Sequence, residues 1–510
     1  MQFKKLIVSL GLATMALPFT GQNQITLHAD LAKERINPEI YGHFAEHLGR
    51  LIYGGIMVEP DSKVENIRGF RSDIIAALRD MKVPILRWPG GCFADTYNWR
   101  DGVGPLQNRP SIVNIYWGGV TEDNSFGTHE FLDFCELIGA DPYINLNVGS
   151  GTVREASQWV EYITSSNPSP MTQLRKENGR DKPWDVKYFG IGNENWGCGG
   201  NMTPEYYADM YLNYATYCGG AKYKIACGPS SEDYNWTDVL MSKTQNKKGT
   251  MQGLSLHHYT IFNDWTIKGS AIDFNEADWH KMLRKTLVME EMINKHDVIM
   301  DKYDPKKEIG LIVDEWGTWY DVMPGTNPGF LFQQNTLRDA MVAGINLNIF
   351  NNNADRVKMA NIAQMVNVLQ AVILTQGDQM VLTPTYYVFK MYNVHHGATM
   401  IPMNIKTEDY KSGDSTLPTV NASASIKDNT VSVTLCNLNA SKPANVEIDI
   451  TGFEMKTTSG QIITGEKIND YNDFGKPEKV GLKTFNVAKP KGNKLTIELP
   501  AKSVVLVQMK

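Results

Sequence analysis

Cysteine is scarce in this sequence, and long hydrophobic runs are almost absent. The 510 residues include six cysteines, with no C-x-x-C pair among them. Such scattered cysteines argue against a disulfide-rich scaffold and against a structural zinc site. After residue 19, no stretch approaches the roughly 18 apolar residues that a membrane-spanning helix needs. We therefore expect no membrane insertion.

An excess of positive charge is also missing. The net charge is −6, which leaves no basic surface for nucleic acid or anionic lipid. Apolar residues make up 42% and charged residues 21%, the proportions of an ordinary globular protein. The 11 tryptophans and 22 tyrosines weakly favour a carbohydrate partner, because aromatic faces stack on sugar rings.

The N-terminus is typical of a secretory signal peptide. Lys4 and Lys5 precede an apolar run over residues 6–19, and small residues follow at Thr20-Gly21. The alternative is a buried first helix or strand. We expect residues 1–21 to be removed and the mature protein to be periplasmic or secreted.

Strand-like and helix-like segments alternate over residues 37–385. Periodic stretches such as 71–81, 128–138 and 204–217 separate short β-rich runs. The eight predicted strands are 40–44, 84–88, 142–147, 186–191, 224–227, 253–257, 309–313 and 347–350. Eight such units predict an α/β fold, a (β/α)8 TIM barrel whose catalytic residues lie at the C-terminal ends of the strands.

Residues 386–510 have a different texture. Short alternating strands are separated by turn residues, which predicts an all-β, jelly-roll-like sandwich. Residues 24–28 alternate in the same way, so segment 22–36 is expected to add a strand to this sandwich. A carbohydrate-binding role is the alternative, but without a clear aromatic strip we favour a structural role.

Residues 43–47, His-Phe-Ala-Glu-His, match the H-x-x-E-H spacing of some zinc peptidases, which place these three side chains on one helix. Here the motif follows Pro38 and Gly42 and precedes Gly49, a context typical of a strand that ends in a loop. No third ligand is evident, so we expect no metal. At the end of a first barrel strand, Glu46 would instead face a substrate pocket.

Two other predicted strands end in a glutamate beside tryptophan. The fourth leads into Gly-Asn-Glu-Asn-Trp at 192–196, and the seventh leads into Asp-Glu-Trp at 314–316. A retaining glycosidase needs two such carboxylates, one to protonate the leaving oxygen and one to attack the anomeric carbon. A merely solvated or salt-bridged glutamate is the alternative. The flanking tryptophans and the matching strand positions favour the catalytic interpretation of Glu194 and Glu315.

Six blocks of sequence together resemble the α-L-arabinofuranosidases of glycoside hydrolase family 51. They are IYGHFAEHLGRLIYGGI (40–56), LRWPGGCFADTYNWRDGVGP (86–105), FGIGNENWGCGGNMTPEYYADMY (189–211), SLHHY (255–259), VDEWGTWY (313–320) and ADRVKMANIAQMVNV (354–368). The blocks follow the family's order across the barrel, and the β-rich tail resembles the family's second domain.

The resemblance implies a retaining, exo-acting enzyme with Glu194 as acid/base and Glu315 as nucleophile. The substrate-binding residues that it implies are Glu46, Cys92, Asn193, Tyr259 and Gln364. The supporting residues that it implies are Arg87, His257 and Trp319. At Cys92 the family often has asparagine, which is a better hydrogen-bonding group.

The resemblance further implies no cofactor, a glycan partner and a homo-oligomer, commonly a hexamer. The glycan could be arabinan, arabinoxylan or a glycoprotein chain. One alternative is a related barrel hydrolase, such as a β-1,4-endoglucanase or a β-xylosidase, and a closed pocket would distinguish an exo-acting enzyme. The other is a binding protein on an inactive barrel, which is disfavoured because both carboxylates are present. Cys92 and Cys198 could be bonded or free.

Overall fold

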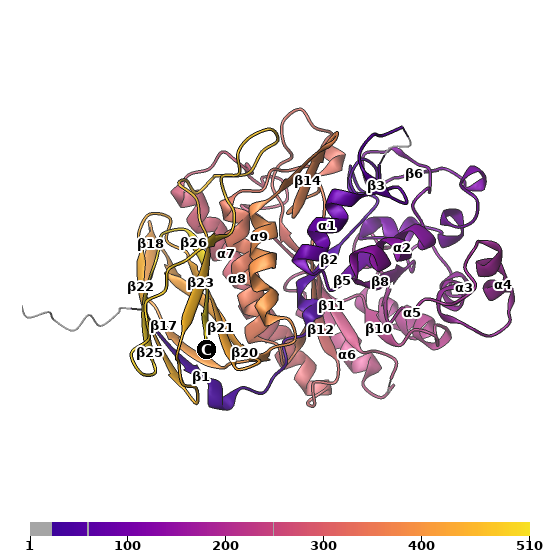
Figure 1. The fold of residues 1–510 in the computed structure, drawn as a ribbon. Helices are drawn as coiled ribbons and strands as arrows, with labels where there is room; N and C mark the ends of the chain where they lie inside the picture. Colours follow the sequence, from indigo (N-terminus) through magenta and orange to yellow (C-terminus); the bar gives the residue numbers. More distant parts are fainter. Residues whose placement is uncertain (1–22, 59–60, 248) are drawn as a thin grey trace, which may run out of the picture.

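The computed structural model describes residues 23–58, 61–247 and 249–510. They form a closed barrel of eight strands and, beside it, a β-sandwich (Figure 1). The predicted TIM barrel with a sheet-rich C-terminal part is confirmed. The predicted signal peptide lies outside the described residues.

All neighbouring strands of the barrel are parallel. In chain order the strands are β2 (Gly42–Phe44), β5 (Ile85–Trp88), β8 (Asp141–Leu146), β9 (Tyr188–Ile191), β10 (Tyr223–Ala226), β11 (Gly253–Thr260), β12 (Gly310–Thr318) and β13 (Val357–Ile362). The barrel closes where β13 pairs with β2. The first seven overlap the predicted strands.

The eighth predicted strand is wrong. Residues 347–350 lie inside helix α8 (Leu337–Asn352), and the strand that closes the barrel is β13. Every residue from Leu337 to Asn351 is buried, because α8 lies between the barrel and the sandwich (Figure 1). A helix buried on all sides has no solvent-facing polar stripe, so periodicity cannot separate its apolar run from a buried strand.

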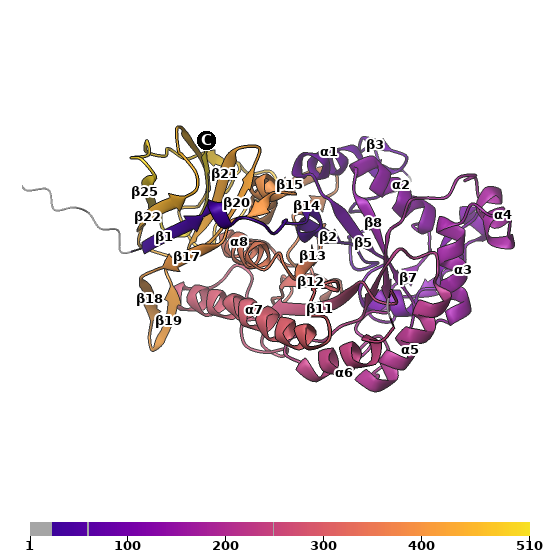
Figure 2. The same cartoon turned by 90° about the horizontal axis from the view of Figure 1, so that it is seen from below.

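The remaining helices pack around the outside of the barrel (Figure 2). They are α1 (Ser72–Met81), α2 (Thr128–Ile138), α3 (Val153–Thr164), α4 (Pro170–Glu177), α5 (Pro204–Tyr217), α6 (Tyr234–Thr244), α7 (Glu276–Tyr303) and α9 (Pro384–Tyr392). Local sequence sets where they begin: Thr203 caps α5 by accepting from the Tyr206 amide, with Pro204 at the first helical position. Within the described chain, no helix combines the length and apolarity needed to cross a membrane.

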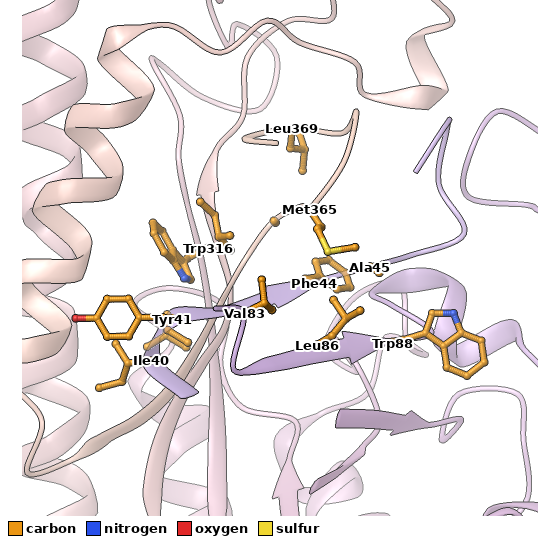
Figure 3. Close-up of a cluster of buried hydrophobic side chains, with 14 of the residues drawn as sticks. Ile40, Tyr41, Phe44, Ala45, Val83, Leu86, Trp88, Trp316, Met365 and Leu369 are labelled. Atoms are coloured by element: carbon orange, nitrogen blue, oxygen red, sulfur yellow. The ribbon is translucent and has the colours of Figure 1, made fainter. Parts of the chain in front are cut away.

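Apolar side chains pack around β2 and β5 (Figure 3). Trp88 stacks on Phe131 of α2, with ring centroids 4.9 Å apart. Because side chains alternate along a strand, the fully buried Leu86 and Trp88 leave Arg87 on the opposite face, inside the barrel. Packing of β5 against its helix therefore fixes the direction of the Arg87 guanidinium.

The sandwich consists of two facing sheets. One contains β17 (Met403–Lys406), β1 (Asn23–His28), β22 (Ala444–Thr451) and β25 (Lys494–Leu499). The other contains β16 (Thr399–Met400), β20 (Val420–Lys427), β21 (Thr430–Asn437), β26 (Ser503–Met509), β23 (Thr458–Ile463) and β24 (Lys483–Thr484). The N-terminal β1 lies between β17 and β22, and the residue at which we expected the sandwich to begin, 386, falls within α9.

A buried polar network joins the sandwich to α8. Asn348 Oδ1 accepts from Ser423 Oγ at 2.8 Å and from Thr434 Oγ1 at 2.7 Å. Asn351 accepts from the Tyr41 hydroxyl at 2.6 Å and donates to Ser423. Since buried polar groups are costly to leave unpaired, this interface holds the two parts together.

Candidate active site

A cavity of about 250 Å³ opens at the C-terminal ends of the barrel strands. Of the predicted site residues, those lining it are Glu46, Cys92, Glu194, His257, Tyr259, Glu315, Trp319 and Gln364. Arg87 and Asn193 are buried behind them: Arg87 donates to Glu315, which lines the cavity, and Asn193 accepts from Arg87. The structure thus brings all ten predicted residues together.

Glu315 lies in the C-terminal half of β12 and is held at both oxygens. Arg87 Nη1 donates to Oε2 at 3.0 Å, and the Tyr259 hydroxyl donates to Oε1 at 2.8 Å. Arg87 also donates to Asn193 Oδ1 at 2.5 Å, which orients that amide. One buried cation therefore positions a carboxylate on β12 and the residue that precedes Glu194.

Glu194 shares a histidine with two other acids. His257 Nδ1 lies 2.9 Å from Glu194 Oε1 and 3.5 Å from Glu315 Oε2, and its Nε2 lies 3.2 Å from Asp314 Oδ1. Burial alone would lower the pKa of His257, but the surrounding carboxylates outweigh it and raise the pKa to about 10. His257 is therefore a cation that can donate a hydrogen bond to each side.

The carboxyl group of Glu194 is disposed to carry a proton. Burial is the main cause that raises its pKa, and the negative charge of Glu315 adds to it, against the opposing effect of His257. An oxygen of Glu194 and an oxygen of Glu315 lie within 4.8 Å of one another. Two close carboxylates with different surroundings are suited to separate acid and nucleophile roles.

The loop that carries Glu194 has unusual backbone geometry. Glu194 itself has φ +45°, in the left-handed region that non-glycine residues seldom adopt. Its carbonyl accepts from the amides of Gly197 at 2.7 Å and Gly199 at 3.0 Å, which closes a tight turn. Asp95 fixes the base of this loop, because its Oδ2 accepts from the Asn193 amide at 2.9 Å.

Glu46 faces the cavity from the loop after β2. Its Oε1 accepts from Trp117 Nε1 at 2.7 Å and the Phe93 amide at 3.0 Å, and its Oε2 accepts from Gln364 at 2.9 Å. Burial, followed by the charge of Glu315, raises the pKa of Glu46 to about 7. A Cβ on Gly90 would lie 2.3 Å from Glu46 Cγ, so this position requires glycine.

The H-x-x-E-H motif does not lie on a helix, as its context predicted. Residues 42–44 are strand β2 and the rest is loop. His43 is buried against the Phe389 ring, and burial lowers its pKa to about 3. His47 bonds Glu122 at 2.9 Å and accepts from Trp88 Nε1 at 3.1 Å, away from Glu46. His43 therefore packs in the core, Glu46 lines the pocket, and His47 holds the loop that carries Glu122.

Cys92 and Cys198 form a disulfide on the wall of the cavity, with Cα atoms 5.5 Å apart. Their sulfurs lie 4.0 Å and 3.5 Å from Glu194 Oε2. Bonded sulfurs carry no hydrogen, so these are contacts and Cys92 has no donor to offer a substrate. The other four cysteines are buried and unbonded within the described chain: Cys135, Cys218, Cys227 and Cys436.

Sequence reasoning missed several residues of the site, among them Asp95, Trp117, Trp265 and Asp314. Asp95 and Asp314 lay in quoted blocks, but only the fold reveals their contacts. Asp314 stands directly before Glu315, and its Oδ2 accepts from the Tyr143 hydroxyl at 2.6 Å. Trp117 lies beside Gly118 and Gly119 between β6 (Ile112–Val113) and β7 (Thr121–Glu122), where no periodic pattern marks it.

Comparison with known proteins bears on this arrangement. The domain described as "Alpha-L-arabinofuranosidase 1 domain" matches residues 77–277, and "Alpha-L-arabinofuranosidase C-terminal domain" matches residues 314–503. A *Bacteroides ovatus* protein named "Intracellular exo-alpha-L-arabinofuranosidase" is 51% identical over 513 residues, which is 99% of each chain. This chain belongs to the α-L-arabinofuranosidases of glycoside hydrolase family 51.

Solved structures of arabinofuranosidases agree with the fold and the family. The arabinofuranosidase from *Xanthomonas axonopodis* pv. *citri* has a TM-score of 0.94 and 49% identity, covering 96% of this chain and 99% of that one. The *Thermotoga maritima* enzyme, solved as an arabinose complex, has a TM-score of 0.81 and 29% identity, covering 95% and 99%. The predicted family and the predicted glycoside hydrolase activity are confirmed.

The predicted location is contradicted by the same comparisons. The Bacteroides ovatus relative aligns with 99% of this chain, and it is named an intracellular enzyme. Export of this arabinofuranosidase to the periplasm or the medium, which residues 1–21 led us to expect, is therefore not supported, and we withdraw it.

Proposed function

We propose that this arabinofuranosidase is a retaining, exo-acting enzyme that removes terminal non-reducing α-L-arabinofuranosyl residues by double displacement. The observation that carries the proposal is the approach of Glu194 to Glu315, whose nearest oxygens lie within 4.8 Å. Retaining glycosidases have carboxyl groups about 5–5.5 Å apart, whereas inverting enzymes need roughly 6.5–9.5 Å to admit a water molecule.

In the first step Glu315 attacks C1 of the arabinofuranosyl ring. Arg87 and Tyr259 hold its two oxygens from opposite sides, so the carboxylate cannot rotate away from the sugar. The attack displaces the glycosidic oxygen and leaves a covalent arabinosyl ester on Glu315. Orientation of the nucleophile before the reaction reduces the entropy that must be lost in the transition state.

Glu194 protonates the departing oxygen in the same step and then deprotonates the water that hydrolyses the ester. Its raised pKa suits the first role. When Glu315 becomes an ester it loses its charge, so one cause of the raised pKa disappears. Glu194 then ionises more readily and can act as a base, with His257 still donating to its Oε1.

The cavity suits one sugar at the end of a chain. Its volume of about 250 Å³ falls below the 300–1,000 Å³ of pockets for drug-sized ligands. A cleft that binds the middle of a polysaccharide would be larger and open at both ends. We assign the ring hydroxyls to Glu46 and Gln364, which line the cavity, and to Asn193, which lies buried directly before Glu194. The relative from *Bacteroides ovatus* is named an exo-acting enzyme, which also supports this interpretation over an endoglucanase.

Two of the tryptophans that line the cavity are placed to contact the part of the substrate next to the terminal sugar. Trp265 is 58% exposed and packs edge-on against Trp319, with ring centroids 5.2 Å apart. Such a face can stack on the next sugar of the chain. We propose arabinose-containing oligosaccharides from arabinan or arabinoxylan as substrates, with release of one arabinose at a time.

Stereochemistry of the first product tests the mechanism. With an aryl α-L-arabinofuranoside and methanol as competing acceptor, early NMR spectra should contain the methyl α-L-arabinofuranoside. The β anomer as first product would exclude a double displacement. Early digests of arabino-oligosaccharides should contain arabinose and the chain shortened by one sugar, and internal cleavage products would exclude exo action.

A further inference from the structure

The disulfide on the cavity wall lies against the proposed acid/base. We propose that reduction of Cys92–Cys198 creates a binding site for one thiophilic divalent cation, Zn²⁺ or Cd²⁺, with Glu194 as the third ligand. The bound cation would block Glu194 and inhibit the enzyme reversibly. The inhibition rests on the proposed function, whereas the cation site itself rests only on the positions of three side chains.

Ligand spacing favours a tetrahedral cation. With bonds of about 2.3 Å to sulfur and about 2.1 Å to oxygen, tetrahedral geometry places a sulfur and an oxygen about 3.6 Å apart. The sulfurs of Cys198 and Cys92 already lie 3.5 Å and 4.0 Å from Glu194 Oε2. Two of the three ligand-to-ligand distances are therefore close to those that zinc requires.

The third distance, between the two sulfurs, can increase only after the disulfide is reduced. Two thiolates on one tetrahedral cation lie about 3.8 Å apart, so the sulfurs must separate once their bond is broken. The loop of Cys198 is held by its carbonyl, which accepts from the Tyr116 hydroxyl at 2.5 Å. With Cα atoms 5.5 Å apart, the two side chains can then reach one ion by rotation.

Glu194 is oriented to serve as a ligand through one oxygen. His257 donates to Oε1 at 2.9 Å, while Oε2 faces the sulfurs. Carboxylate ligands of metals are commonly hydrogen-bonded in this way, which fixes their direction. Cys92 lines the open cavity, so a hydrated ion can enter, and a water molecule would complete the coordination.

The redox step is balanced with a water-soluble trialkylphosphine. The phosphine attacks one sulfur and breaks the S–S bond, and water then converts it to the phosphine oxide. The disulfide gains two electrons and two protons, which gives two thiols. Cation binding then displaces the thiol protons, as thiolate coordination requires.

Binding can be measured without any activity assay. After phosphine treatment and anaerobic desalting, the reduced enzyme should bind one Cd²⁺ per chain, with an ultraviolet thiolate-to-cadmium absorption band. The oxidised enzyme and reduced Cys198→Ser should lack the band. Reduced Cys135→Ala, which removes a buried thiol in α2, is the matched control and should behave as the unaltered enzyme does.

The carboxylate ligand is tested by Glu194→Gln. Reduced Glu194→Gln should bind Cd²⁺ about tenfold or more weakly, because a neutral amide replaces a charged ligand. Equal affinity would remove Glu194 from the site. Absence of the band in the reduced enzyme, or the same band in Cys198→Ser, would overturn the site altogether, with circular dichroism showing that each variant is folded.

Inhibition is then measured on an arabino-oligosaccharide, relative to each protein's own rate without cation. One equivalent of Cd²⁺ should lower the rate of the reduced enzyme on the order of 10²-fold, the loss expected when a general acid is blocked. Reduced Cys198→Ser should keep its rate. Stoichiometric binding with full activity would refute the blocking role. Should Glu194→Gln itself stay active, the acid/base assignment fails while the cation site stands.

Discussion

Replacing Glu194 by alanine should produce a defect that depends on the leaving group. The partly buried carboxyl group lies beside His257 and has a raised pKa, which suits it to carry the proton that the leaving oxygen takes. General acid catalysis contributes about 10²–10⁴-fold. On a natural disaccharide, whose leaving alkoxide needs a proton, the first step should slow by that factor.

A nitrophenyl arabinofuranoside should behave differently, because its leaving group departs as a stable anion. The first step should be nearly normal, and the second should slow by about 10²–10⁴-fold since no base activates water. A burst of nitrophenol should therefore precede a slow phase. Azide needs no base, so it should restore turnover and yield the arabinosyl azide of retained configuration.

Two variants make the reasoning refutable. Glu194→Gln keeps a group that can bond to His257 but cannot transfer a proton, so it should share the defect. Glu315→Ala should be inactive on both substrates, because no leaving group replaces a missing nucleophile. Swapped behaviour of the two positions would reverse their roles, and full activity of Glu194→Ala on the disaccharide would refute the acid assignment.

Three further predictions follow from the contacts of single elements. Gly90→Ala should lower kcat/KM roughly tenfold or more, because the added Cβ would displace Glu46 from its hydrogen bonds, and bonds to a charged group are each worth about 1.5–3 kcal/mol. The control is Gly139→Ala, which is also at positive φ but has open space around it, and equal kinetics of the two variants would contradict this prediction. His43→Leu should move acid unfolding to lower pH. Between pH 6.5 and about 3, His43 binds a proton in the unfolded chain but not when buried, which lowers the free energy of unfolding by about 2 kcal/mol at pH 5. An unchanged midpoint in a pH titration followed by circular dichroism would count against this prediction. A chain ending at Tyr392 should be insoluble because it exposes the sandwich face of α8, and a soluble, active truncate would show that the sandwich is dispensable.

The order of local patterns was sufficient to predict the barrel. Strand–helix alternation repeats along the chain, and each strand end is a local feature, so Glu194 and Glu315 could be placed on one face before any contact was known. The one misplaced strand, at 347–350, shows the limit. Burial of α8 on every side depends on the sandwich that packs on it, which no local window contains.

Tertiary structure decided what each polar side chain does. Within one motif, His43 became a core residue, Glu46 a pocket carboxylate and His47 a partner of Glu122, 75 residues away. The Cys92–Cys198 bond, which the sequence left open, depends equally on distant loops. The sequence by itself determined which residues reach the rim, because strand periodicity is local. Only the closed barrel decided their partners, since hydrogen bonds and charge interactions act over a few ångströms between positions far apart in the chain.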